Sequence, residues 1–151
     1  MAQHYRKLEI DFDMPDMLFG IMVLSLCDNN LTIICDCGED KDHLQISFYG
    51  ALAYSIHDEF SHPTMDQSKD TAKPPETKSG SYYPALEVIE SEWLAEFGEF
   101  RTQGRLSKIK HFRFLSGSNI ADILCEDDFG VKTISGSDIL KVEEFIEGVN
   151  A

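Results

Sequence analysis

The chain has 151 residues and a mass of 17.1 kDa, which is the size of one domain and too short for two independent cores. Hydrophobic residues make up 42% and charged residues 26%, a composition that excludes wholesale disorder and fibrous repeats. Thirteen Lys and Arg against 27 Asp and Glu leave a formal net charge of −14. A protein with this negative charge repels the phosphate backbone of nucleic acids, so we expect no binding to DNA or RNA. We expect a single domain over residues 1–151.

The N-terminus and the apolar runs predict where the protein works. The first ten residues contain no apolar run of signal-peptide length. The longest mostly apolar stretch, Met17 to Cys27, falls short of the roughly 20 residues that cross a bilayer. In the absence of a secretory signal we expect the four cysteines to be reduced thiols. The sequence therefore predicts a cytoplasmic protein without a membrane partner.

The first half of the chain reads as strands. Apolar and charged side chains alternate from Lys7 to Met14, which predicts a half-buried strand. Met17 to Cys27 fits either a buried strand or a helix. Leu31 to Cys37 is predicted as a strand, and the alternation from Leu44 to Ile56 predicts one long antiparallel strand, bent or bulged at Gly50. Ser61 to Pro84, with four prolines and few apolar side chains, is predicted as a long flexible loop.

The second half reads as a helix, three strands and a helix. Apolar side chains at three- and four-residue steps predict a helix that ends before Gly104; they are Leu86, Ile89, Trp93, Phe97 and Phe100. The segments 109–115, 120–125 and 129–135 read as a three-stranded meander joined by two hairpin turns. Helical spacing predicts a final helix over 138–147. The fold class is α+β, mainly an antiparallel β-sheet with two helices, one after the long loop and one at the C-terminus.

Cysteines and histidines are the first candidates for chemistry. Cys35 and Cys37 invite a metal interpretation, completed by Cys27, Cys125 or His43. Because both lie on the apolar face of the predicted strand, buried core thiols are the favoured interpretation, with neither metal nor cofactor. His43, His57 and His111 fit no ligand or catalytic spacing and are predicted at the surface or a strand edge. No catalytic residue is assigned.

Charge patterning gives the one candidate contact surface. Glu92, Glu96 and Glu99 are spaced as a stripe beside the apolar arc of the helix, where like charges repel one another slightly. Such a stripe suits a cationic partner, and the alternative is a solvated face that keeps the protein soluble. The following stretch is basic and is expected to pair with the chain's own carboxylates, with Glu92 or Glu96 as candidates; its members are Arg101, Arg105, Lys108, Lys110 and Arg113.

Three motifs carry a resemblance to a protein family. They are Ser91-Glu92-Trp93-Leu94-Ala95-Glu96-Phe97, Lys110-His111-Phe112-Arg113-Phe114 and Ala121-Asp122-Ile123-Leu124-Cys125-Glu126-Asp127. Over about half its length the chain resembles the immunity proteins of bacterial toxin systems. The resemblance implies a single α+β domain that binds a cognate toxin and has no enzyme activity of its own.

The sequence thus favours a non-enzymatic acidic binding protein, an immunity-type inhibitor of a basic toxin, acting as a monomer or dimer. A fast, steered association of an anionic inhibitor with a basic toxin agrees with this interpretation. Two alternatives stay open: a chaperone-like or ligand-binding module, and a small enzyme whose site is not visible in the sequence.

Overall fold

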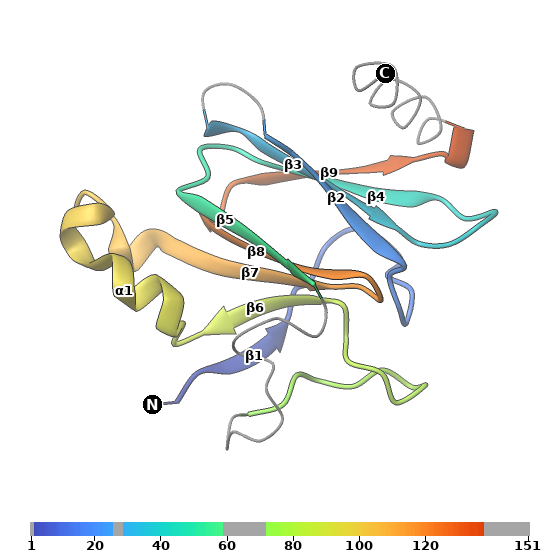
Figure 1. Ribbon diagram of the computed structural model, residues 1–151, viewed down its shortest axis with the longest axis horizontal. Helices are drawn as coiled ribbons and strands as arrows, with labels where there is room; N and C mark the ends of the chain where they lie inside the picture. The colour runs from blue at the N-terminus through green and yellow to red at the C-terminus, as the bar shows by residue number, and fades with distance from the viewer. Residues whose placement is uncertain (1, 26–28, 59–71, 138–151) are drawn as a thin grey trace.

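Two antiparallel sheets make up the computed structural model, which describes residues 2–25, 29–58 and 72–137 (Figure 1). The five-stranded sheet consists, in spatial order, of β1 (His4–Lys7), β6 (Ala85–Ile89), β7 (Ile109–Leu115), β8 (Asn119–Glu126) and β5 (Ala53–Asp58). The four-stranded sheet consists of β2 (Gly20–Ser25), β3 (Leu31–Asp36), β4 (His43–Phe48) and β9 (Phe129–Ile134). Helix α1 (Glu92–Arg101) follows β6, and the 3-10 turn η2 (Leu106–Lys108) leads into β7.

The hydrophobic core lies between the two sheets. The ring of Phe48 on β4 packs 5.7 Å from that of Phe112 and 6.2 Å from that of Phe114, both on β7. Cys35, Cys37 and Cys125 are buried in or against the same apolar cluster, so the prediction of core thiols is confirmed for these three. Cys27 lies outside the described residues. A fully buried Phe side chain contributes about 1.5–3 kcal/mol by leaving water, so this aromatic cluster is a main link between the sheets.

The first strand predicted, from Lys7 to Met14, is wrong beyond Lys7, because the observed strand lies earlier in the chain. The strand β1 ends at Lys7, and the Leu8 N–H makes a last bond to the Ala85 carbonyl at 3.0 Å. Beyond it the chain is irregular, yet the predicted apolar face still points inward, because Ile10 and Phe12 pack against the core. The open question over 17–27 is settled in favour of a strand, β2, over Gly20–Ser25, while residues 17–19 precede it outside any strand.

The long strand predicted from Leu44 to Ile56 is wrong. The alternation belongs to two strands in different sheets, β4 and β5. The chain turns between them at Gly50, whose φ of +70° favours glycine. A turn that keeps the two-residue alternation on both sides is indistinguishable from a bulge by pattern alone.

The predicted meander holds only for its first hairpin. β7 and β8 pair as expected, from Ile109 opposite Glu126 to Leu115 opposite Ile120. After the acidic turn the chain crosses to the other sheet, where β9 pairs with β4 and not with β8. The other edge of β8 is taken by β5, so no place beside β8 remains for β9.

The first predicted helix begins too early. Leu86 and Ile89 belong to β6, which is buried between β1 and β7. Glu90 has a φ of +55°, which breaks the strand, and Ser91 then caps α1. Leu86 and Ile89 in the strand happen to continue the helical spacing of the apolar residues of α1. The pattern therefore predicted one helix in place of a strand and a shorter helix.

Some predicted segments lie wholly or partly outside the described residues. The predicted C-terminal helix over 138–147 is one, and 61–71 of the predicted loop is another. The described part of that loop forms a small turn, in which the Tyr83 N–H donates to the Pro75 carbonyl at 2.7 Å. The described residues therefore show an α+β fold with one α-helix. None of their helices has the length and apolar character needed to cross a membrane.

Candidate functional site: an anchored acidic helix

Helix α1 projects from the ends of β6 and β7 at one side of the molecule (Figure 1). None of its residues is buried; Trp93 and Phe97 are half-buried, while Glu92, Glu96 and Glu99 are exposed. The ring of Trp93 packs edge-on, 5.5 Å from His111 on β7 and 5.9 Å from Phe97. Such a lightly packed helix depends for its position on how its N-terminus is held.

Two side chains satisfy the backbone donors of the first turn. The Ser91 hydroxyl accepts a hydrogen bond from the Leu94 N–H at 3.0 Å, which is the standard N-cap bond. Gln3, just before β1, accepts from the Glu92 N–H through its side-chain oxygen at 2.8 Å. The start of α1 is thereby attached to the N-terminal segment of the chain, 89 residues away in sequence.

Below the cap lies a buried histidine–carboxylate pair. His111 Nδ1 lies 2.6 Å from the Ser91 hydroxyl, and its Nε2 lies 2.5 Å from Asp122 Oδ1 on β8. The Ser91 oxygen already accepts a hydrogen bond from the Leu94 N–H. The hydroxyl proton of Ser91 is used as well when it is donated to His111 Nδ1. Nε2–H then donates to Asp122. Both nitrogens of the imidazole are therefore hydrogen-bonded.

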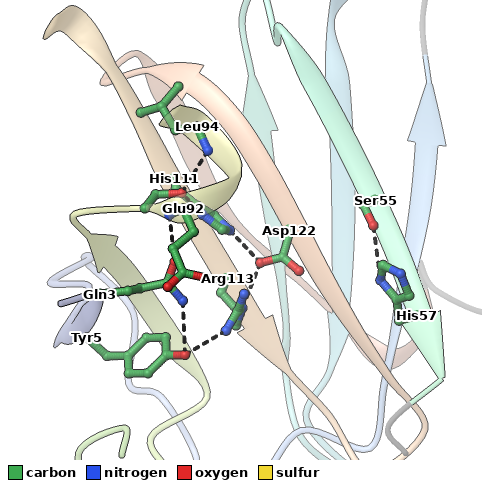
Figure 2. Close-up of polar contacts among 10 residues, drawn as sticks. Gln3, Tyr5, Ser55, His57, Glu92, Leu94, His111, Arg113 and Asp122 are labelled. Carbon is green, nitrogen blue, oxygen red and sulfur yellow. Dashed lines mark hydrogen bonds and ion pairs between the residues drawn. The ribbon is translucent and has the colours of Figure 1, made fainter. Parts of the chain in front are cut away.

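Arg113 continues the network from Asp122 to β1 (Figure 2). Arg113 is 1% exposed, and its guanidinium donates from Nε to Asp122 Oδ1 at 2.7 Å and from Nη1 to the Tyr5 hydroxyl at 3.0 Å. Tyr5 in turn accepts from the Gln3 amide at 3.4 Å. We call this set the anchor network; it comprises Gln3, Tyr5, Ser91, His111, Arg113 and Asp122. It forms a closed circuit that joins β1, β7, β8 and the first turn of α1.

The hydrogen bonds join Ser91 to His111 and His111 to Asp122, the same residue types as in a catalytic triad. The geometry nevertheless serves a structural role. Ser91 is 8% exposed, and its oxygen is occupied as the helix cap. The adjacent Glu92 N–H, which would face an oxyanion, is bonded to Gln3, and Trp93 covers the edge of the imidazole. A nucleophile needs access to substrate, which this buried serine lacks. We therefore interpret the anchor network as the support of α1.

The sequence predictions missed this network. His111 was expected at the surface or an edge and is buried, as is His43, which accepts from the Cys37 N–H at 2.9 Å. His57 is half-buried beside Ser55. The signal was present in the predicted hairpin, because a turn over 116–119 places Arg113 opposite Asp122. The burial of that charge pair was not predictable from the hairpin alone.

Three residues of the basic stretch, Arg105, Lys110 and Arg113, pair with the chain's own carboxylates, so the prediction holds in part; Arg101 and Lys108 form no ion pair within the described residues. Arg105 lies 3.1 Å from Glu126, and Lys110 Nζ lies 2.9 Å from Asp127 and 3.4 Å from Glu87. The hydrogen bond to Asp127 is the main reason that the pKa of Lys110 is raised. Pairing of the stretch with Glu92 or Glu96 is wrong, because no ion pair joins those two residues to any part of the described chain.

The predicted stripe is interrupted in the structure. Gly98 has φ 63° and ψ −179°, which are not helical angles, so Glu99 lies beyond a kink from Glu92 and Glu96. Phe100, predicted on the buried apolar arc, is instead 95% exposed. The acidic helix surface is therefore defined here by Glu92, Glu96, Glu99 and Phe100.

Neither a cluster of metal-binding side chains nor a similar protein assigns a function to the site. Within residues 2–25, 29–58 and 72–137 no three His, Cys, Asp or Glu side chains gather as a metal site. No family model, curated protein or solved structure matches the chain. The resemblance to immunity proteins accordingly stays a prediction.

Proposed function

We propose that this chain is a non-enzymatic acidic binding protein that associates with a basic protein through the acidic helix surface. The observation that carries the proposal is the contrast between the two charged sets beside each other. Arg105, Lys110 and Arg113 are used in internal ion pairs. The three glutamates of α1 are exposed and have no ion pair within the described chain.

The charge balance supports a cationic partner. The chain has 14 more acidic than basic residues, so ion pairs within the chain cannot neutralise its negative charge. A surface of one sign raises the association rate with an oppositely charged protein by about 10–1000-fold at low ionic strength. Among basic protein partners, the resemblance of the three motifs favours a toxin, which makes the chain an immunity-type inhibitor in the cytoplasm, acting as a monomer or dimer.

The test is an association rate measured against salt. A candidate partner comes from the adjacent gene or from a pull-down in the native host, and the triple variant is Glu92→Lys, Glu96→Lys and Glu99→Lys. We expect the wild-type rate to fall between low and physiological salt, where the Debye length shrinks to about 8 Å. The triple variant should associate at least about tenfold more slowly at low salt and lose most of that dependence.

A charge-matched variant separates the helix from the net charge. Glu9→Lys, Asp11→Lys and Asp16→Lys change the total charge equally at exposed positions away from α1. They should reduce the rate much less than the α1 variant does. Equal effects of the two variants would show that only total charge matters, and an unchanged rate in the α1 variant would exclude this helix as the contact.

A cavity favours a second candidate, a small-ligand module. It has a volume of about 410 Å³ and lies between the segment after β1 and the β3–β4 turn. That volume is within the range of ligand sites. Its walls are apolar and charged; they are Phe12, Asp13, Met14, Pro15, Cys37, Lys41, Asp42 and Thr133. Thermal-shift screening of small amines and amphiphiles, with Met14→Trp to fill the cavity, tests it: a ligand whose stabilisation is lost in that variant supports this function.

A further inference from the structure

The kink in α1 exposes an aromatic side chain that a regular helix would bury. Trp93, Phe97 and Phe100 are spaced at four and three residues, which places them on one face of a continuous helix. Trp93 and Phe97 do face inward and pack on each other. Phe100 is 95% exposed, because the backbone leaves the helical path at Gly98.

The backbone angles at Gly98 are specific to glycine. The combination of φ 63° and ψ −179° lies in a region that residues with a Cβ atom hardly enter. Nothing lies within 4 Å of a Cβ built at Gly98, so the glycine is needed for its angles and not for space. Glycine adopts a positive φ without steric cost, so the residue at 98 permits the kink.

The turn that carries Phe100 is held in place beyond the kink. Thr102 is fully buried, and its hydroxyl donates to the Gly98 carbonyl at 2.9 Å. The Gly104 N–H donates to the Glu99 carbonyl at 2.8 Å. Arg101 lies 4.0 Å over the Phe97 ring and covers it from the outside. The exposed ring is thus presented by an ordered turn and not by a frayed helix end.

We infer that Phe100 is the hydrophobic anchor of the acidic helix surface and inserts into an apolar recess on a basic protein. The inference rests on the proposed function and specifies its partner further. Charge complementarity favours this occupant, because Glu99 directly precedes the exposed ring in the chain and Glu92 and Glu96 are exposed on the preceding turns of the same helix, so Lys or Arg suit the surroundings of the recess. A buried aromatic anchor within a polar rim is the usual arrangement of an interface hot spot.

The experiment uses the full chain and a defined probe. The immobilised protein is used to select from a phage-displayed library of random 12-residue peptides, and enriched peptides are synthesised. We expect them to combine Lys or Arg with an aromatic or long aliphatic residue. Phe100→Ala should weaken their binding about tenfold or more, while Tyr54→Ala, an exposed aromatic on β5, should leave it within about twofold.

A second pair of variants tests the kink itself. Gly98→Ala should weaken peptide binding as Phe100→Ala does, because it favours a regular helix that turns the ring inward. Gly80→Ala provides the matched control, since Gly80 also has a positive φ of +88° with open space around it and lies outside α1. It should leave binding unchanged.

Three other outcomes would contradict the proposal that Phe100 anchors a basic partner. Basic peptides that ignore Phe100→Ala but are lost in the triple glutamate variant would leave the proposed function standing without this anchor. Failure to enrich basic peptides would count against both. Sedimentation that shows a dimer lost in Phe100→Ala would assign the ring to a second copy of this chain and exclude the proposed partner.

Discussion

The anchor network predicts that Asp122 is among the most costly residues to neutralise. Its carboxylate accepts from His111 Nε2 at 2.5 Å and from Arg113 Nε at 2.7 Å, and its side chain is 4% exposed. Asp122→Asn keeps the shape but removes the negative charge beside Arg113, a residue that is 1% exposed.

The expected cost is large for one substitution. Removing one partner of a buried ion pair costs about 3–5 kcal/mol, because the other charge stays buried without it. Both bonds go to Oδ1, so an amide oxygen at that position still accepts them and the cost is that of the lost charge beside Arg113; we expect the lower end of that range, about 3 kcal/mol. Domains of this size have about 5–15 kcal/mol of stability in total. A melting temperature lower by roughly 10 °C corresponds to that loss.

Urea unfolding followed by far-UV circular dichroism measures the effect. The control is Asp127→Asn, which breaks the ion pair to Lys110 at a carboxylate whose side chain is 55% exposed. That pair should contribute less than about 1 kcal/mol. Arg113→Met in the Asp122→Asn background should recover part of the loss, because it removes the buried charge. Equal costs for Asp122→Asn and Asp127→Asn would refute the interpretation of a buried anchor.

Two further predictions concern the cap and the core thiols. Ser91→Ala should cost about 2 kcal/mol in urea unfolding, since it removes both the N-cap bond and the buried bond to His111; a loss below about 0.5 kcal/mol would contradict the anchor role. Burial raises the pKa of the Cys125 thiol in the folded protein to about 11. The folded state therefore keeps its full stability below the thiol pKa of the unfolded chain and loses stability as pH rises from that value through the folded-state pKa. From about pH 8 to pH 10, wild type should therefore lose about 1.4 kcal/mol more than Cys125→Ala, and equal losses would show that the thiol is accessible.

Much of the sheet structure follows from local pattern. The strands from 31 to 36 and from 109 to 115 were predicted nearly to the residue, because alternation and turn residues agree there. The burial of Cys35 and Cys37 followed from the same alternation. These features depend on neighbours in sequence, which is the information that a pattern contains.

The features that failed depend on distant contacts. The crossing of β9 to β4 is decided by which sheet edge is free, and that depends on β5 occupying β8. The separation of β4 from β5 depends on a single turn at Gly50. Neither is encoded in the residues of the strands themselves.

The candidate site was predictable in part. The spacing of Glu92, Glu96 and Glu99 indicated an exposed acidic helix, and all three are exposed on α1. The spacing of the apolar residues predicted that Phe100 is buried. That prediction failed because the backbone leaves the helical region at Gly98, which the spacing does not reveal. The exposed ring, which adds an apolar element to the surface, came only with the structure.

The central claim, that α1 is the contact with a basic protein partner, is tested most directly by mapping the contact. Backbone amide resonances of the labelled protein are followed as the basic peptide recovered by selection is added. We predict that the largest changes fall on residues 92–101, with the cavity near Phe12 unaffected. Changes concentrated at that cavity or on β5, with α1 unchanged, would contradict the account.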